Sequence, residues 1–156
     1  MKIRRPLFPA VIAVAAVSLT SIAVSAVAAE TPFKGTVNAD ETVVPSPPTA
    51  SLTRDGTGTA TYLGRYSEHI LMTIYLPTLS STGTATFTSA NGDTLTATVI
   101  GQATRTGPTT LSIVEVYTIT GGTGRFADAT GNFTLHSNVD QTTGVSSGTF
   151  SGVLGH

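Results

Sequence analysis

The stretch Ile119–Gly131, ITGGTGRFADATG, decides the fold. An apolar, strand-like segment, Ser112–Thr120, runs into it, and a second strand-like segment, Asn132–His136, leaves it. Its glycines suit a tight turn, because glycine adopts positive φ without steric cost. The spacing also lets Phe126 point inward. The stretch therefore predicts a turn between two antiparallel strands, and it says more about fold than about chemistry.

Short segments rich in threonine and small apolar residues recur on both sides of this turn. Threonine favours strands because its branched Cβ fits a pleated surface, and turn residues bound each segment, Asn91-Gly92 giving the strongest hairpin signal. No apolar period of 3.6 residues extends over ten residues beyond the N-terminal segment. The predicted strands are Glu30–Asp40, Thr59–Tyr66, His69–Leu76, Thr84–Thr88, Thr94–Val99, Ser112–Thr120, Asn132–His136 and Val145–Leu154.

The segments between these strands read as loops or turns. The predicted connections are Val43–Ser51 with its three prolines, a turn at Ser67-Glu68, and the loops Ser80–Gly83, Gly101–Thr110 and Asn138–Gly144. An all-β chain of this length closes into a barrel or splits into a sandwich. Sequential hairpins favour the barrel, which leaves no exposed edge. We therefore expect a single closed antiparallel barrel of eight strands.

The N-terminus carries the pattern of a secretory signal peptide over residues 1–29. Lys2, Arg4 and Arg5 precede an apolar run that ends in small residues near Ala28 and Ala29. We expect a cleaved signal, a secreted or periplasmic protein without stable membrane insertion, and one barrel domain over residues 30–156. That domain holds five basic and nine acidic residues, a net charge of −4 that offers no nucleic-acid footprint. An outer-membrane barrel is less favoured, because the chain has no Trp and four Tyr for aromatic girdles.

The glycine segment Gly121–Gly131 resembles the GGxGxFxxAxG segment of the allene oxide cyclase and dirigent families. Gly92-Asp93-Thr94 and the glycine-rich segment Gly148–Gly152 are similar to these families as well, and the segment Gly56–Thr61 is similar to the bacterial secreted relatives in this group. The resemblance implies an eight-stranded antiparallel barrel with a central cavity and, as in the plant relatives, a homotrimer. It also implies a cofactor-free cyclase or isomerase, or a guide for the coupling of phenolic radicals. A homodimer remains an alternative.

Glu115 and Tyr117 are the leading candidates for chemistry. Period-2 alternation places them on one face with Ile113 and Ile119. If that face lines the cavity, burial raises the pKa of the Glu115 carboxyl and makes it an acid, a base or a ligand anchor. If the face is outward, Glu115 is solvated.

Two weaker candidates are His69 and Arg65. His69 shares a face with Leu71 and Tyr75 and either ends a strand, hydrogen-bonded or solvated, or binds a ligand. Arg65 either meets Glu115 across the barrel or forms a surface ion pair. The three histidines lack the spacing of metal ligands, and we expect no metal or cofactor.

Two functions of different classes fit this sequence. In the first, the barrel binds a small apolar or phenolic molecule, since a barrel of eight strands can hold one small ligand; a cyclase is its enzymatic version. The candidate ligand contacts are Tyr62, Tyr66, Tyr75, Glu115, Tyr117 and Phe126. In the second, the interior is filled and the protein has a structural or surface-interaction role. The volume of the interior separates the two.

Overall fold

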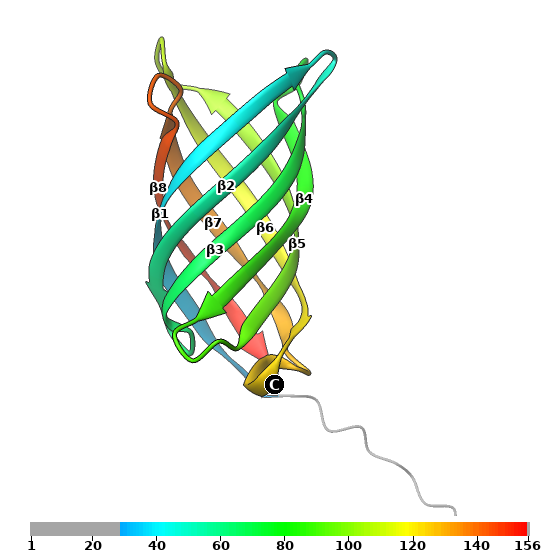
Figure 1. Cartoon of the computed structure of the whole chain (residues 1–156), viewed down its shortest axis with the longest axis vertical. Helices are drawn as coiled ribbons and strands as arrows, with labels where there is room; N and C mark the ends of the chain where they lie inside the picture. The colour runs from blue at the N-terminus through cyan, green and yellow to red at the C-terminus, as the bar shows by residue number, and fades with distance from the viewer. Residues whose placement is uncertain (1–28, 156) are drawn as a thin grey trace, which may run out of the picture.

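The structure is a computed structural model that describes residues 29–155, and it is a closed barrel of eight antiparallel strands (Figure 1). The strands are β1 (Glu30–Ser46), β2 (Thr49–Ala60), β3 (Gly64–Tyr75), β4 (Ser80–Ser89), β5 (Thr94–Arg105), β6 (Thr110–Gly122), β7 (Thr130–Asp140) and β8 (Val145–Gly155). Each strand pairs with the next, and β1 pairs with β8 to close the barrel. The predicted fold class is confirmed. Apart from Ala29, the predicted signal peptide lies outside the described residues.

Alternation along each strand separates the interior from the surface. On β6, Ile113, Tyr117 and Ile119 are buried, whereas Val114 and Val116 between them are about 40% exposed. The outward positions of β4 and β5 are mostly threonines, such as Thr84 and Thr98, which face each other across the pair. Successive side chains of a strand point to opposite faces, so one alternating pattern supplies both the core and the polar surface.

The strands are longer than the sequence predicts, and several predicted loops are strand. The segment Val43–Ser51 is a hairpin in which β1 and β2 pair up to Ser46 and Thr49 around Pro47 and Pro48. Ser67 and Glu68 lie inside β3 rather than at a turn, and Ser80–Gly83 begins β4. The predictions failed there because residues typical of loops continue the strands: Ser67 faces outward on β3, Ser81 and Gly83 face inward on β4, and Pro45 lies where β1 pairs with β2 alone.

The two ends of the barrel differ. The η1 end carries the start of β1, the end of β8 and the turn between β6 and β7, where the short 3-10 helix η1 (Gly124–Phe126) lies (Figure 1). The cavity end carries the β1–β2, β3–β4, β5–β6 and β7–β8 turns. Gly121, Gly124 and Gly131 have φ of 128°, 55° and 122°, as the glycine segment predicts, and they turn the buried Phe126 side chain inward.

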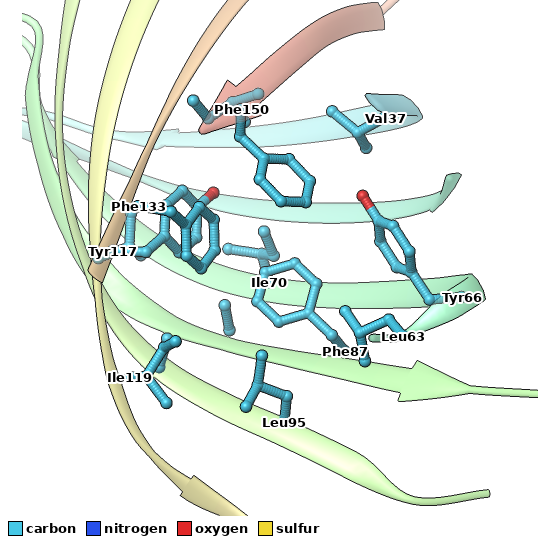
Figure 2. Packing of buried hydrophobic residues seen from close by; sticks show 14 of the residues in the cluster. Val37, Leu63, Tyr66, Ile70, Phe87, Leu95, Tyr117, Ile119, Phe133 and Phe150 are labelled. Atoms are coloured by element: carbon cyan, nitrogen blue, oxygen red, sulfur yellow. The ribbon is translucent and has the colours of Figure 1, made fainter. Parts of the chain in front are cut away.

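The half of the barrel near the η1 end is filled by an aromatic core, defined as Phe33, Tyr66, Phe87, Tyr117, Phe133 and Phe150. Tyr117 and Phe133 stack face to face with ring centroids 4.5 Å apart, as Figure 2 shows, and Phe133 also meets Phe33, Phe87 and Phe150. Aromatic contacts of this kind add about 0.5–1.5 kcal/mol per pair to the burial of the rings. This half is a dense hydrophobic core.

Within residues 29–155, no helix has the length and apolar character needed to cross a membrane.

Candidate functional site: a cavity with a charged floor

The other half of the barrel contains a cavity of about 460 Å³. Its walls are mostly aliphatic and come from seven strands, β1 to β7, and two end turns. It runs from the buried Glu115 to the exposed Thr142 and Thr143 in the β7–β8 turn, and so reaches the surface at the cavity end. The apolar lining residues are Val43, Leu52, Met72, Ile74, Leu76, Leu79, Ala103, Leu111, Ile113 and Val139. Ligand pockets of this size and composition are usual for small molecules.

Small inward residues on β4 and β5 create this space. Near the cavity end these strands present Ser81, Gly83, Gly101 and Ala103 inward, whereas toward the η1 end they present Phe87, Leu95 and Val99. Gly101 is the position where a side chain would clash most directly with the floor. A Cβ there would lie 2.5 Å from the Ser81 Oγ and 3.1 Å from the Glu115 Cγ. The absent side chain at Gly101 leaves room for the Glu115 side chain.

Arg54, a residue of β2, organises the floor of the cavity. Its guanidinium is bidentate to Glu115, with Nη1 donating to Oε1 over 3.2 Å and Nη2 donating to Oε2 over 2.7 Å. Its Nε lies 3.2 Å from the Glu68 Oε1, and its Nη1 lies 3.5 Å from the Glu41 Oε1. Three carboxylates from β1, β3 and β6 therefore surround one cation, with side chains that are at most 5% exposed.

Tyr117 joins this charged floor to the aromatic core. Its hydroxyl donates to the Glu115 Oε2 over 2.7 Å and accepts a hydrogen bond from the Arg54 Nη2, while its ring stacks on Phe133. Both oxygens of Glu115 are thus occupied by Arg54 and Tyr117. Charge-assisted, bidentate bonds of this type hold a carboxylate in one geometry.

Of the two carboxylates that line the cavity, Glu41 is held by fewer bonds than Glu115. It lies opposite Arg54 in the β1–β2 register, and its backbone N–H donates to the Gly144 carbonyl oxygen over 2.7 Å. Its side chain is 5% exposed and lines the cavity. Within the described part of the chain, its Oε1 accepts no hydrogen bond. Among the described residues, the cation paired with Glu41 is Arg54, 3.5 Å away, so Glu41 presents to the cavity a carboxylate oxygen that has no hydrogen-bond donor.

Burial dominates the titration of this cluster. Desolvation raises the pKa of Glu68 to about 7 against the attraction of Arg54, and it raises the pKa of Glu41 in the same way. The nearby carboxylates add to both effects. Burial likewise raises the pKa of the Tyr117 hydroxyl, which stays neutral and donates its proton. One arginine is not enough to hold three buried carboxylates in the ionised form.

The structure brings two predicted site residues together, Glu115 and Tyr117, and both face inward as the alternation predicts. The alternative of a solvated Glu115 is wrong, because its side chain is 3% exposed. Tyr66 is buried in the aromatic core, where its hydroxyl donates to the Thr36 carbonyl oxygen over 2.9 Å. Phe126 is buried at the η1 end. Neither Tyr66 nor Phe126 lines the cavity.

The remaining predicted residues face outward. Tyr62 lies in the β2–β3 turn and Tyr75 at the end of β3, 44% and 46% exposed. His69 is exposed on β3, its Nδ1 2.6 Å from the Asp55 Oδ1, which fits the hydrogen-bonded alternative. Arg65 is exposed, so the alternative in which it meets Glu115 across the barrel is wrong and its surface position is the one the structure shows. The arginine that meets Glu115 is Arg54, which shares inward parity with Leu52 and Gly56.

Sequence reasoning missed Arg54, Glu41 and Glu68. The signal that identifies Arg54 is the alternation Ala50, Leu52, Arg54, Gly56 along one segment. It was hidden because the segment up to Ser51 reads as a proline-rich loop.

Among residues 29–155 no group of three or more histidine, aspartate or glutamate side chains is arranged to hold a metal ion. Comparison with known proteins gives no match to this chain, neither among protein-family models, nor among curated proteins, nor among solved structures.

Proposed function

We propose that this protein binds one small, mainly apolar molecule in the cavity, outside the cytoplasm. The observation that carries the proposal is the cavity itself, which holds about 460 Å³ inside a barrel whose other half is packed with aromatic rings. A barrel selected only for stability gains by filling its interior, because each void forgoes packing contacts. An interior that is dense at one end and hollow at the other supports a binding role over a purely structural one.

The lining suggests how such a molecule lies. Aliphatic side chains from β2, β3, β5, β6 and β7 form the walls, and Glu41, Glu115 and Ser81 supply polar atoms at the floor. A molecule with an apolar body and one polar end therefore fits with that end directed inward. Apolar walls supply affinity, and a few placed polar groups fix orientation.

Binding fits the floor better than catalysis does. Glu115 is the carboxylate that the sequence favours as an acid or base, yet Arg54 and Tyr117 occupy both of its oxygens. A general base needs a free lone pair within reach of the proton that it abstracts, and these bonds already engage both oxygens of Glu115. The resemblance to cyclase and dirigent barrels therefore supports a ligand cavity rather than a particular reaction.

The test is fluorescence titration with N-phenyl-1-naphthylamine, a neutral apolar probe that brightens in a dry pocket. We expect saturable binding to the wild-type protein at one site. Ala103→Phe places a ring in the cavity from β5 and should weaken binding at least tenfold. The matched control is Thr104→Phe, the same side chain on the exposed face of the next residue, which should leave binding unchanged. Equal binding by both variants, or no binding by the wild type, would overturn the proposal.

A further inference from the structure

We infer that the ligand of this cavity carries a cationic group, such as an alkyl ammonium, that sits against the Glu41 carboxylate. The inference rests on the proposed binding function and names the chemistry of the ligand's polar end. It starts from the charges at the floor, where three carboxylates face one guanidinium.

The basic partner of the floor is turned away from the cavity. Arg54 directs Nε to Glu68 and both terminal nitrogens to Glu115, and it does not line the cavity. No lysine, arginine or histidine among the described residues lines the cavity either. The acidic groups that do line it are Glu41 and Glu115. At the rim, the exposed Arg105 binds the Gln141 side chain with its Nη1. Deeper in the cavity, the charged lining groups among the described residues are the carboxylates Glu41 and Glu115, which disfavours a carboxylate or phosphate at the floor.

Glu41 has a carboxylate oxygen that a bound cation could contact. Its side chain is 5% exposed, and its Oε1 accepts no hydrogen bond within the described residues. Its nearest cationic atom is the Arg54 Nη1 at 3.5 Å, beyond a normal charge-assisted hydrogen bond. A buried acceptor without a donor is costly unless a partner arrives. An ammonium supplies donors and a charge of the required sign.

The direction in which the pKa of Glu41 is shifted agrees with this geometry. The charged groups that face Glu41 are Arg54 on β2, Glu68 on β3 and Glu115 on β6. Burial, with Glu115 adding repulsion, raises the pKa of Glu41 against the attraction of Arg54, so this carboxyl keeps its proton to a higher pH than an exposed glutamate does. A cation bound at Glu41 would compensate the negative charge of the carboxylate, as a bound proton does. Binding should therefore release a proton when the pH lies near the raised pKa.

The experiment compares three probes with the same chain and different ends. Calorimetric titration of the full protein at about pH 8 uses n-octylamine, n-octanol and sodium octanoate, with the amine charged at that pH. We expect the amine to bind at least tenfold tighter than the alcohol, and octanoate to bind weakest. Near the pH at which Glu41 takes up its proton, the heat of amine binding should also change with the ionisation enthalpy of the buffer, which reports proton release.

Glu41→Gln should abolish the preference for the amine while octanol still binds. Its matched control is Asp40→Asn, which removes the same charge from the neighbouring exposed residue and should keep the preference. Equal affinity for amine and alcohol, tightest binding of octanoate, or an unchanged preference in Glu41→Gln would each overturn the cationic ligand and leave the binding function standing. Binding of none of the three probes would instead overturn the proposed function, and the inference with it.

Discussion

The two halves of the barrel use the same strands and the same alternation, yet they differ in what the inward positions hold. β4 illustrates this within one strand, with Phe87 packed in the aromatic core and Ser81 lining the cavity. β6 shows it as well, running from the stacked Tyr117 through Glu115 to Leu111 in the cavity wall. The size and charge of each inward side chain, rather than the strand itself, decide whether a level of the barrel is core or site.

The difference also separates stability from binding. The aromatic core is apolar apart from two tyrosine hydroxyls, and its rings contact one another directly. The cavity half keeps a void and a charged cluster, both of which cost folding free energy. We therefore expect mutations in the core to change the free energy of unfolding, and mutations around the cavity to change it much less.

The largest expected effect comes from Phe133→Ala. Phe133 is 2% exposed and contacts the rings of Phe33, Phe87, Tyr117 and Phe150, so its removal should cost about 4 kcal/mol of unfolding free energy. The matched variant in the other half is Leu111→Ala, which removes a side chain that already borders the cavity and should cost about half as much. Urea denaturation measures both. Equal losses would show that the two halves do not differ in packing.

The second effect is pH dependence, which belongs to the cavity half. Burial raises the pKa of Glu68 to about 7 from its ordinary 4.5, so the folded state prefers the neutral carboxyl. Between these two values the folded protein binds more protons than the unfolded one, and stability falls as the pH rises. The contribution of Glu68 is thus fully present below about pH 4.5 and lost above about pH 7, a change of roughly 3 kcal/mol.

Glu68→Gln isolates this contribution, because it keeps the shape of the side chain and cannot ionise. The difference in unfolding free energy between the variant and the wild type, measured in urea from about pH 4 to about pH 8, should rise in favour of the variant. The exposed Asp128, at the other end of the barrel, gives the control variant Asp128→Asn, which should show no such rise. A difference that is flat with pH, or that falls, would contradict the buried and weakly compensated floor.

The sequence shows the inward face of β6 but conceals most of the floor, and the reason is physical. Ile113, Glu115 and Tyr117 alternate with other residues within a strongly apolar segment, so the segment alone shows that they share one face of the strand. Glu41 lies just before a proline-rich stretch. β1 continues through Pro45 because its end pairs with β2 alone, beyond the last β8 pair at Asp40 and Val145, in a hairpin that projects at the cavity end (Figure 1).

The cavity itself is a property of neighbours that are distant in sequence. Ser81 on β4 and Gly101 on β5 leave a space that matters only because Leu52 on β2 and Leu111 on β6 face it. Nothing in the local pattern reveals which small inward residues meet others across the lumen. Strand pairing and closure, which bring them together, are set by the whole barrel.

The smallest effect, and the sharpest comparison, comes from two glycines at inward positions. Gly152 on β8 lies between Phe33 and Phe133 in the strand register, and a Cβ there would come within 2.1 Å of the Asn132 backbone oxygen and 2.4 Å of the Phe133 Cα. Gly101 on β5 would place its Cβ against the side chains of Ser81 and Glu115. Backbone cannot yield without moving a strand, whereas the Ser81 hydroxyl can rotate into the cavity.

We therefore expect Gly152→Ala to cost about 2 kcal/mol and Gly101→Ala less than about 1 kcal/mol in urea denaturation. Neither glycine has a positive φ, so the comparison tests space alone. Binding of the naphthylamine probe should show the reverse order, because the added methyl group at Gly101 pushes on the floor while that at Gly152 is remote from the cavity. Equal destabilisation by Gly101→Ala and Gly152→Ala would show that the cavity half is as tightly packed as the aromatic half. It would contradict the assignment of stability to one half and of binding to the other.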